Sequence, residues 1–382
     1  MDGMLTSTEA AARLGVKVST LYVYVSRGLL VSHRAPEGRR SLFRVEDVEA
    51  LARRSRGGRS VESRLAVVTT AITELRADGP SFRGRSAVEL AAGTSPEDVA
   101  GLLWDAGPGP WAPTPIDPPP GLAPRDRMPW TVVMVGAADP LRSDLRPSAV
   151  VRAARRLIST LATGPSVELP ADAPLALRLA TTCTGPNPPA PVVRAFGTAM
   201  VLLADHELAT STLAVRVAAS TRADLYDALL AGLGTLAGPL HGSASRLVLD
   251  LLRRAGVDGA PAALDDALRW QGLVPGFGHA AYPHGDPRHV ALLEAVRDIA
   301  DDERRTTVDQ VIALAADADL PAPNIDLALG ALAYCTDMAP ETLPLLFAVA
   351  RCPGWVAHYM EELDEAPLRF RARAVHVTSS QG

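Results

Sequence analysis

Three short segments in the C-terminal half of the chain decide the fold: GPLHG at residues 238–242, PGFGHAAYPHGDPR at 275–288 and PNID at 323–326. Each places histidine or aspartate side chains among glycines, prolines and apolar residues. Any one of them has an ordinary structural explanation, because a lone histidine often packs or caps and an aspartate is favoured in a helix's first turn. Their occurrence together, in this order, requires a common explanation.

Helical periodicity dominates the chain around these segments. The clearest patterns cover residues 147–162, 188–207, 223–238, 244–255, 288–300, 306–315, 325–335 and 343–363. Residues 61–107 are predicted to be helical with short turns, and nine prolines predict a loop at 108–129. Only 4% of residues are aromatic while 47% are hydrophobic, so Ala, Leu and Val must fill a core that suits packed helices. We predict a mainly α body.

The first 59 residues are organised differently. Residues 6–15 predict a helix whose start, TSTE, fits a capping box, and residues 19–28 predict a second helix capped by its first serine. Two short strands joined as a hairpin are expected within 29–44, followed by a third helix over 44–56. This order is that of winged helix-turn-helix DNA readers. Residues 6–30 resemble the MerR/excisionase type of helix-turn-helix.

The charge distribution supports a nucleic-acid partner for this head. Residues 1–59 carry 11 Lys and Arg against 6 Asp and Glu, a net charge of +5, so the rest of the chain, whose total is −5, carries −10. The candidate contacts to duplex DNA are Tyr22, Tyr24 and Arg27 on the second helix and Arg39, Arg40 and Arg44 on the wing. The alternative is a small helical cap that uses arginine for solubility and ion pairs.

The three opening segments, in their order, look like the active-site segments of citrate synthases. DHEL at 205–208 and RCPGWVAHYMEE at 351–362 fit the same family, and residues 67–104 resemble its amino-terminal region. The resemblance covers roughly residues 61–376. Departures from the usual pattern are Ala209, Ser243, Ala281 and His376, which bear on substrate preference and rate more than on the chemistry.

The resemblance implies a mainly α fold with a large and a small domain, behind the small winged helix-turn-helix domain. We expect the head at 1–59, the large domain at 60–242 and 341–382, and the small domain at 243–340. It also implies a homodimer in which the small domain closes over oxaloacetate before the acyl-CoA binds.

The activity implied is that of the tricarboxylic acid cycle enzyme, which condenses acetyl-CoA with oxaloacetate and water to citrate and CoA. Asp326 matches the family's base, and its apolar neighbours favour a desolvated, competent carboxylate. His241 matches the group that hydrogen-bonds the thioester oxygen, and a following helix N-terminus disfavours its imidazolium form. His279 matches the group that polarises the ketone.

Oxaloacetate is a dianion and needs cationic side chains. The resemblance assigns this role to His206, Arg288, Arg351 and Arg371. Arg371 is expected to reach the partner subunit's site, with Arg369 and Arg373 as rivals. The CoA contacts carried over from the family are Pro275, Gly276, Phe277 and Gly278. No metal and no cofactor besides the CoA thioester substrate is expected.

Two alternatives stay open. A 2-methylcitrate synthase would use propionyl-CoA, and one methylene changes selectivity by only about 1–3 kcal/mol. A transcription regulator would use the body as a sensor for oxaloacetate or citrate, although a sensor has no need of the base Asp326. Three cysteines in no metal or redox spacing, no apolar run of membrane length and no signal-peptide pattern predict a cytoplasmic protein away from membranes.

Overall fold

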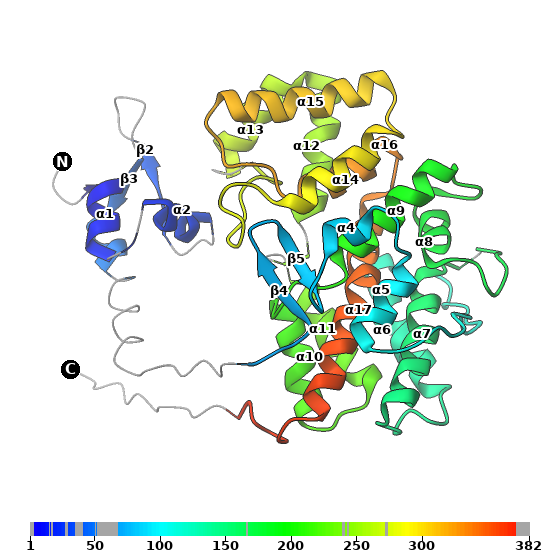
Figure 1. The fold of residues 1–382 in the computed structure, drawn as a ribbon. Coiled ribbons are helices and arrows are strands. Elements are labelled where there is room, and N and C mark those ends of the chain that lie inside the picture. The colour runs from blue at the N-terminus through cyan, green and yellow to red at the C-terminus, as the bar shows by residue number, and fades with distance from the viewer. Residues whose placement is uncertain are drawn as a thin grey trace. The chain divides into compact units, whose positions relative to one another are not determined.

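The computed structural model describes residues 4–14, 16, 18–26, 30–34, 41–49, 51, 68–165, 167–238, 241–242, 244–271 and 274–371. The chain divides into two compact units, residues 1–69 with 266–274 and residues 70–265 with 275–382. Figure 1 shows the elements of both. The finer division of the body into a large and a small domain stays a prediction.

The described residues of the head contain helices and a three-stranded antiparallel sheet with the order β1-β3-β2. Its elements are β1 (Met4–Thr6), α1 (Ser7–Leu14), α2 (Val18–Ser26), β2 (His33–Arg34) and β3 (Ser41–Arg44), and residues 45–49 are also helical. The predicted capping box is confirmed, because the Thr6 N–H donates to the Glu9 carboxylate at 2.8 Å and the Glu9 N–H donates to the Thr6 hydroxyl at 3.3 Å. The second helix begins at Val18, one residue before the predicted cap Ser19.

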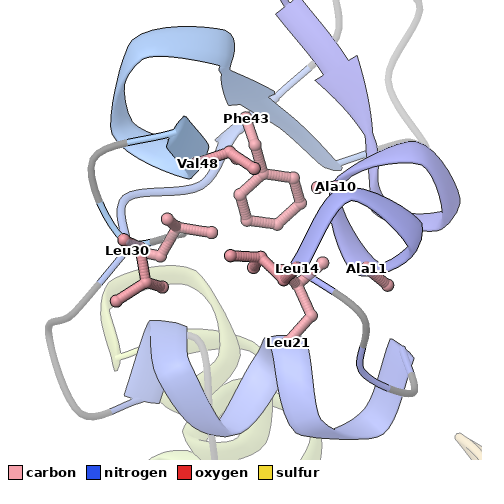
Figure 2. Packing of buried hydrophobic residues seen from close by; sticks show 8 residues of the cluster. Ala10, Ala11, Leu14, Leu21, Leu30, Phe43 and Val48 are labelled. Carbon is pink, nitrogen blue, oxygen red and sulfur yellow. The ribbon is translucent and has the colours of Figure 1, made fainter. Parts of the chain in front are cut away.

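A small apolar core holds the head together, as Figure 2 shows. Phe43 of β3 is fully buried at its centre, against residues of both helices. The cluster consists of Ala10, Ala11, Leu14, Leu21, Leu30, Phe43, Val48 and Leu51. The helix-turn-helix and the strand pair β2–β3 therefore form one packed module.

The body is built from helices, as its periodicity predicts. They are α4 (Ala87–Ala91), α5 (Pro96–Trp104), α6 (Pro124–Ala137), α7 (Pro147–Ala162), α8 (Leu175–Thr184), α9 (Ala190–Leu203), α10 (Thr210–Ser220), α11 (Leu225–Leu236), α12 (Ala244–Asp258), α14 (Pro287–Arg297), α15 (Asp302–Asp317), α16 (Ile325–Cys335), the 3₁₀ turn η1 (Pro340–Thr342) and α17 (Leu343–Leu363). Helix α13 (Ala260–Gln271) crosses the division between the two units. The bounds of α7, α16 and α17 coincide with those predicted from sequence.

One part of the body differs from the prediction. Within 61–107, an antiparallel sheet of β4 (Thr73–Arg76), β5 (Gly79–Phe82) and β6 (Arg85–Ser86) stands where helix was expected. Both connections are two-residue turns, and Gly84 takes a left-handed φ of 83° in the second. Asp78-Gly79 is a turn signal that outweighs the weak helical pattern there, and Gly79 takes a left-handed φ of 117° as the first residue of β5. The proline-rich loop also ends sooner than predicted, because α6 begins at Pro124.

Helix α17 runs through the middle of the larger unit and packs against α5, α7, α9, α10 and α11 (Figure 1). Glycine allows the closest of these approaches: a Cβ on Gly232 of α11 would lie 2.8 Å from Val215 and 3.3 Å from Trp355. Trp355 is fully buried, so α10, α11 and α17 are locked together around it. Among the described residues, no helix is both long and apolar enough to span a bilayer.

Candidate functional site

Two loops that carry the sequence signals are joined by backbone hydrogen bonds. The Asn324 N–H donates to the Gly276 carbonyl at 2.9 Å, and the Gly278 N–H donates to the Ala322 carbonyl at 2.8 Å. The Asn324 side chain also donates to the Gly278 carbonyl at 2.7 Å. Gly276 and Gly278 both have left-handed φ angles, 87° and 81°, which glycine adopts without strain. The 275–286 loop and the start of α16 therefore form one rigid edge of the site.

Asp286 ties this edge together and was not singled out from sequence. Its carboxylate accepts from the Arg288 guanidinium at 2.9 Å and 2.8 Å, and from the Ile325 N–H at 3.0 Å. Burial raises the pKa of Asp286, but the hydrogen bonds from Arg288 outweigh this effect and hold the pKa below its usual value. The signal that could have revealed it is its place before Pro287, since it is the N-cap of α14.

His279 lies in a cluster of rings with His206 and Tyr282, at centroid distances of 5.2 Å and 4.9 Å. Its Nδ1 accepts a hydrogen bond from the Ala281 N–H at 3.1 Å. Burial, reinforced by Arg288, lowers the pKa of His279, so the ring is neutral near pH 7 with its proton on Nε2. That Nε2 lies 3.4 Å from Nη2 of Arg288. The Nε2–H of His279 and Nη2 of Arg288, both donors, therefore face the same point, where one acceptor of a ligand can bind both.

His206 and Tyr282 each bury a polar atom without a partner. Nε2 of His206 and the hydroxyl of Tyr282 have no hydrogen bond among the described residues. Burial lowers the pKa of His206 far below its usual value, and the positive charges of Arg288 and Arg351 lower it further. Burial raises the pKa of Tyr282 to about 12. Unsatisfied buried groups are costly, so they point to a ligand.

Arg351 approaches the site from α17. Its Nε donates to the Leu203 carbonyl at 2.7 Å, and the side chain is only 2% exposed. Its two terminal nitrogens have no acceptor among the described residues. Burial lowers the pKa of Arg351 to about 10, while Asp205 and Asp326 act in the opposite direction. An anion bound here would satisfy this guanidinium.

Asp326 occupies the first turn of α16. Its N–H donates to the Asn324 side chain at 2.9 Å, and Oδ1 of its carboxylate accepts from the Ser245 hydroxyl at 2.7 Å. Burial raises the pKa of Asp326, opposed by Ser245 and by the positive charges of Arg288 and Arg351. The influence of both arginines places this carboxylate beside the cationic part of the site.

His241 lies just before α12, and its Nε2 is 2.9 Å from the Ser211 hydroxyl. Burial, with Arg351 second, lowers the pKa of His241, so the ring is neutral near pH 7. Phe347 of α17 packs edge-on against it, with the ring centroids 6.4 Å apart. Arg288 and Arg351 thus act, between them, on the pKa values of the other sequence-predicted residues, which are His206, His241, His279 and Asp326.

A second buried network lies behind His206. Nε2 of His358 is 3.2 Å from Oδ2 of Asp205, and Arg216 faces its Nδ1 at 2.9 Å. Because Arg216 can only donate, the ring proton of His358 lies on Nε2 and is donated to Asp205. Arg216 also pairs with Glu362 at 2.8 Å. Asp205 lies in DHEL, His358 and Glu362 lie in AHYMEE and Arg216 lies on α10, but nothing in the sequence shows that these segments pair.

The candidate arginines near the C-terminus differ in their pairing. Arg369 forms a two-pronged pair with Glu362 at 2.6 Å and 2.5 Å. The Arg371 side chain is exposed and has no ion pair among the described residues. Arg373 lies outside the described residues. Of the two described candidates, only Arg371 is therefore available to another molecule.

In the head, Tyr22 is 40% exposed and its hydroxyl lies 2.9 Å from that of Ser7, whereas Tyr24 packs partly buried against the core. Arg44 is exposed at the end of β3. Arg27, Arg39 and Arg40 lie outside the described residues. Within the part of the chain that the structure describes, no group of three His, Cys, Asp or Glu side chains could hold a metal ion.

Family models match both parts of the chain. The model for the citrate synthase C-terminal domain matches residues 126–373, and a helix-turn-helix domain model matches residues 4–56. The 2-methylcitrate synthase of Mycobacterium tuberculosis H37Rv is 32% identical over 341 residues, which cover 78% of this chain and 85% of that enzyme. The citrate synthase of Mycolicibacterium smegmatis is 38% identical over 185 residues, 47% of this chain and 49% of that enzyme. In this last match the chain spans about half the length of the relative.

Solved citrate synthase structures share the fold. The enzyme from Pyrobaculum aerophilum matches with a TM-score of 0.71 at 22% identity, covering 91% of this chain and 95% of that chain. The ternary complex of the Thermoplasma acidophilum enzyme with carboxymethyl coenzyme A and oxaloacetate matches with a TM-score of 0.70 at 20% identity, covering 85% and 97%. The predicted mainly α fold with a small helix-turn-helix head is confirmed. The chain belongs to the citrate synthase family.

Proposed function

We propose that this protein condenses acetyl-CoA with oxaloacetate and water to give citrate and CoA. The observation that carries the proposal is a cluster of donors, the partnerless Nε2 of His206 with His279, Arg288 and the buried Arg351, beside a carboxylate, Asp326, whose pKa is raised by burial. A dianionic keto acid supplies acceptors for these donors, and a buried carboxylate is a suitable base.

Oxaloacetate binds first in this mechanism. Its carboxylates take the free nitrogens of Arg288 and Arg351, and Nε2 of His206 donates to the same ligand. The keto oxygen accepts from Nε2 of His279, whose tautomer is fixed by the Ala281 N–H. Arg371 completes a carboxylate site, in the partner subunit of a proposed homodimer.

Enolisation of the thioester follows. Asp326 removes a methyl proton from acetyl-CoA, and the electron pair of that C–H bond forms the enol(ate). The thioester oxygen is stabilised by His241. When the Ser211 hydroxyl donates to Nε2 of His241, the ring proton lies on Nδ1 and is free for this oxygen. A neutral imidazole suits the task because it donates without protonating the thioester.

Carbon–carbon bond formation completes the reaction. The enol(ate) carbon attacks the ketone carbon, and His279 protonates the new alkoxide. Water then hydrolyses the citryl-CoA thioester, which releases CoA and makes the condensation irreversible. The 275–278 segment, PGFG, is proposed to line the CoA site.

The acyl preference of the proposed reaction has a specific alternative, because a 2-methylcitrate synthase is 32% identical to this chain over 78% of its length. Propionyl-CoA is the alternative substrate. The test is the release of free CoA by purified protein with oxaloacetate and either thioester. A higher kcat/KM for acetyl-CoA than for propionyl-CoA supports the first assignment, and the reverse order supports the second. If neither thioester leads to release of CoA, both assignments are contradicted.

Oxaloacetate alone is expected to stabilise the protein, because its site requires the folded arrangement of Arg288 and Arg351. At a hundred times its Kd a ligand adds about 2.7 kcal/mol, which raises Tm by about 3 °C in a chain of this length. Differential scanning fluorimetry with and without oxaloacetate measures the shift. Arg351→Leu should abolish it, whereas Arg297→Leu, which removes an exposed arginine of α14, should not. An unmoved wild-type Tm contradicts the site.

The head is proposed to bind duplex DNA weakly and with strong salt dependence. Phosphate contacts release counterions, and the head carries a charge of +5. Gel retardation of full-length protein should show binding at 50 mM salt and a loss of about tenfold or more at 200 mM. A fragment of residues 60–382 should lose DNA binding and keep CoA release. If the full chain retains no DNA at low salt, the head is a structural cap or a partner-docking module, and the alternative of a DNA-binding regulator with a sensor body is excluded too.

A further inference from the structure

Beyond the groups placed in the reaction above, one serine contacts the candidate base directly. The Ser245 hydroxyl donates to Oδ1 of Asp326 at 2.7 Å, and Ser245 is only 5% exposed. We propose that Ser245 is a positioning residue for proton transfer: it holds Oδ1, directs Oδ2 to the substrate and keeps the carboxylate ionised. The inference rests on the function proposed for this site.

Close packing of α12 against α16 fixes this hydrogen bond. A Cβ on Gly330 would lie 2.4 Å from a methyl carbon of Val248, and a Cβ on Gly276 would lie 2.8 Å from the other. Val248 follows Ser245 by three residues on α12, and Gly330 follows Asp326 by four on α16. The contact between Val248 and Gly330 therefore lies one helical turn from the contact between Ser245 and Asp326. The absence of a side chain at Gly330 lets the helices approach closely enough for Ser245 to reach Asp326.

The two carboxylate oxygens of Asp326 have different surroundings. Oδ1 accepts the bond from Ser245, whereas Oδ2 receives no hydrogen bond from the described residues. In the proton transfer, the C–H bond of the thioester methyl breaks, its electron pair enters the enol(ate), and the proton binds Oδ2. Ser245 keeps its own proton throughout. The hydroxyl therefore orients the base without taking part in the exchange.

The same bond opposes the effect of burial. An ionised oxygen is a better acceptor than a protonated one, so a donor at 2.7 Å favours the carboxylate. The other charges acting on Asp326 are Arg288 and Asp286 at the start of α14 and Arg351 on α17. These stay in place when only the hydroxyl of Ser245 is removed. A change in the titration of Asp326 in such a variant therefore isolates the contribution of Ser245.

The test is the pH dependence of kcat/KM for the acyl-CoA, measured on the full chain with saturating oxaloacetate. In Ser245→Ala the acid limb should move up by about one to two pH units, since bonds to charged groups have that strength. Ser245→Thr keeps the hydroxyl and should restore the wild-type limb. Ser220→Ala removes an equally buried hydroxyl that donates to the Val217 carbonyl on α10, and should leave the limb unmoved. A lower plateau with an unmoved limb in Ser245→Ala overturns the proposal.

A second readout separates this inference from the proposed function. Carbon-13 labelling of aspartate carboxyl groups, with Asp326→Asn to assign the signal, gives the titration of Asp326 by NMR without turnover. A higher midpoint in Ser245→Ala supports the proposal even if no thioester is turned over, in which case the proposed function alone fails. An unchanged midpoint overturns the role of Ser245, whatever the activity.

Discussion

Asp326→Asn is expected to fold, to bind oxaloacetate and to lose about 10²–10⁴-fold in kcat, the range that a positioned base contributes. Asparagine keeps the shape of the side chain, and its amide can still accept from Ser245, so α12 and α16 should stay in place. The amide cannot take a proton from the thioester methyl. Steady-state CoA release measures the loss, and the oxaloacetate-induced rise in Tm checks that the site is intact.

Asp309→Asn provides the matched control for this variant. Asp309 is an exposed aspartate of α15 that pairs with Arg297 at the surface, and its neutralisation should leave kcat within about twofold, as expected for surface changes. More than a tenth of the wild-type rate in Asp326→Asn would remove Asp326 from the role of base. Loss of the oxaloacetate response as well would mean that Asp326 supports the site rather than the proton transfer.

The sequence predicts those elements whose signals are local. Helices α7, α16 and α17 have the predicted bounds because each combines a 3.6-residue apolar period with clear ends. The sheet β4–β6 was missed because its strands have two to four residues, too few to show alternation. Its only strong signal, Asp78-Gly79, is a turn signal that also suits a connection between helices.

Much of the candidate site could be read from sequence, but not the contacts that support it. His241, His279 and Asp326 each lie in a short distinctive segment. By contrast, Ser245 meets Asp326 across 81 residues, and His358 meets Asp205 across 153. Periodicity and capping carry no information about such pairs, because these are determined by which helices pack together. A serine in a helix's first turn and a histidine on a buried helix both have ordinary local explanations.

Glu362→Ala is expected to have the largest effect on stability, lowering the free energy of unfolding by about 3–5 kcal/mol. Glu362 is fully buried at the end of α17 and pairs with Arg216, also fully buried, and with Arg369. Removing this carboxylate leaves the two guanidinium groups with excess positive charge, relieved in part by Glu361, which pairs with Arg216 at 2.6 Å. Equilibrium urea unfolding measures the loss, and Tm should fall by about 4–6 °C.

Glu365→Ala is the control on the same segment. Its carboxylate is 37% exposed and lies 3.9 Å from Arg369, and an exposed pair of this kind contributes about 0–1 kcal/mol. The double variant Arg216→Met/Glu362→Leu tests the cause, because it removes both buried charges while keeping apolar volume. Recovery of part of the lost stability in the double variant would identify the unpaired charge as the cause. Equal small losses in Glu362→Ala and Glu365→Ala would contradict this account, since the buried network would then not hold α17 against α10.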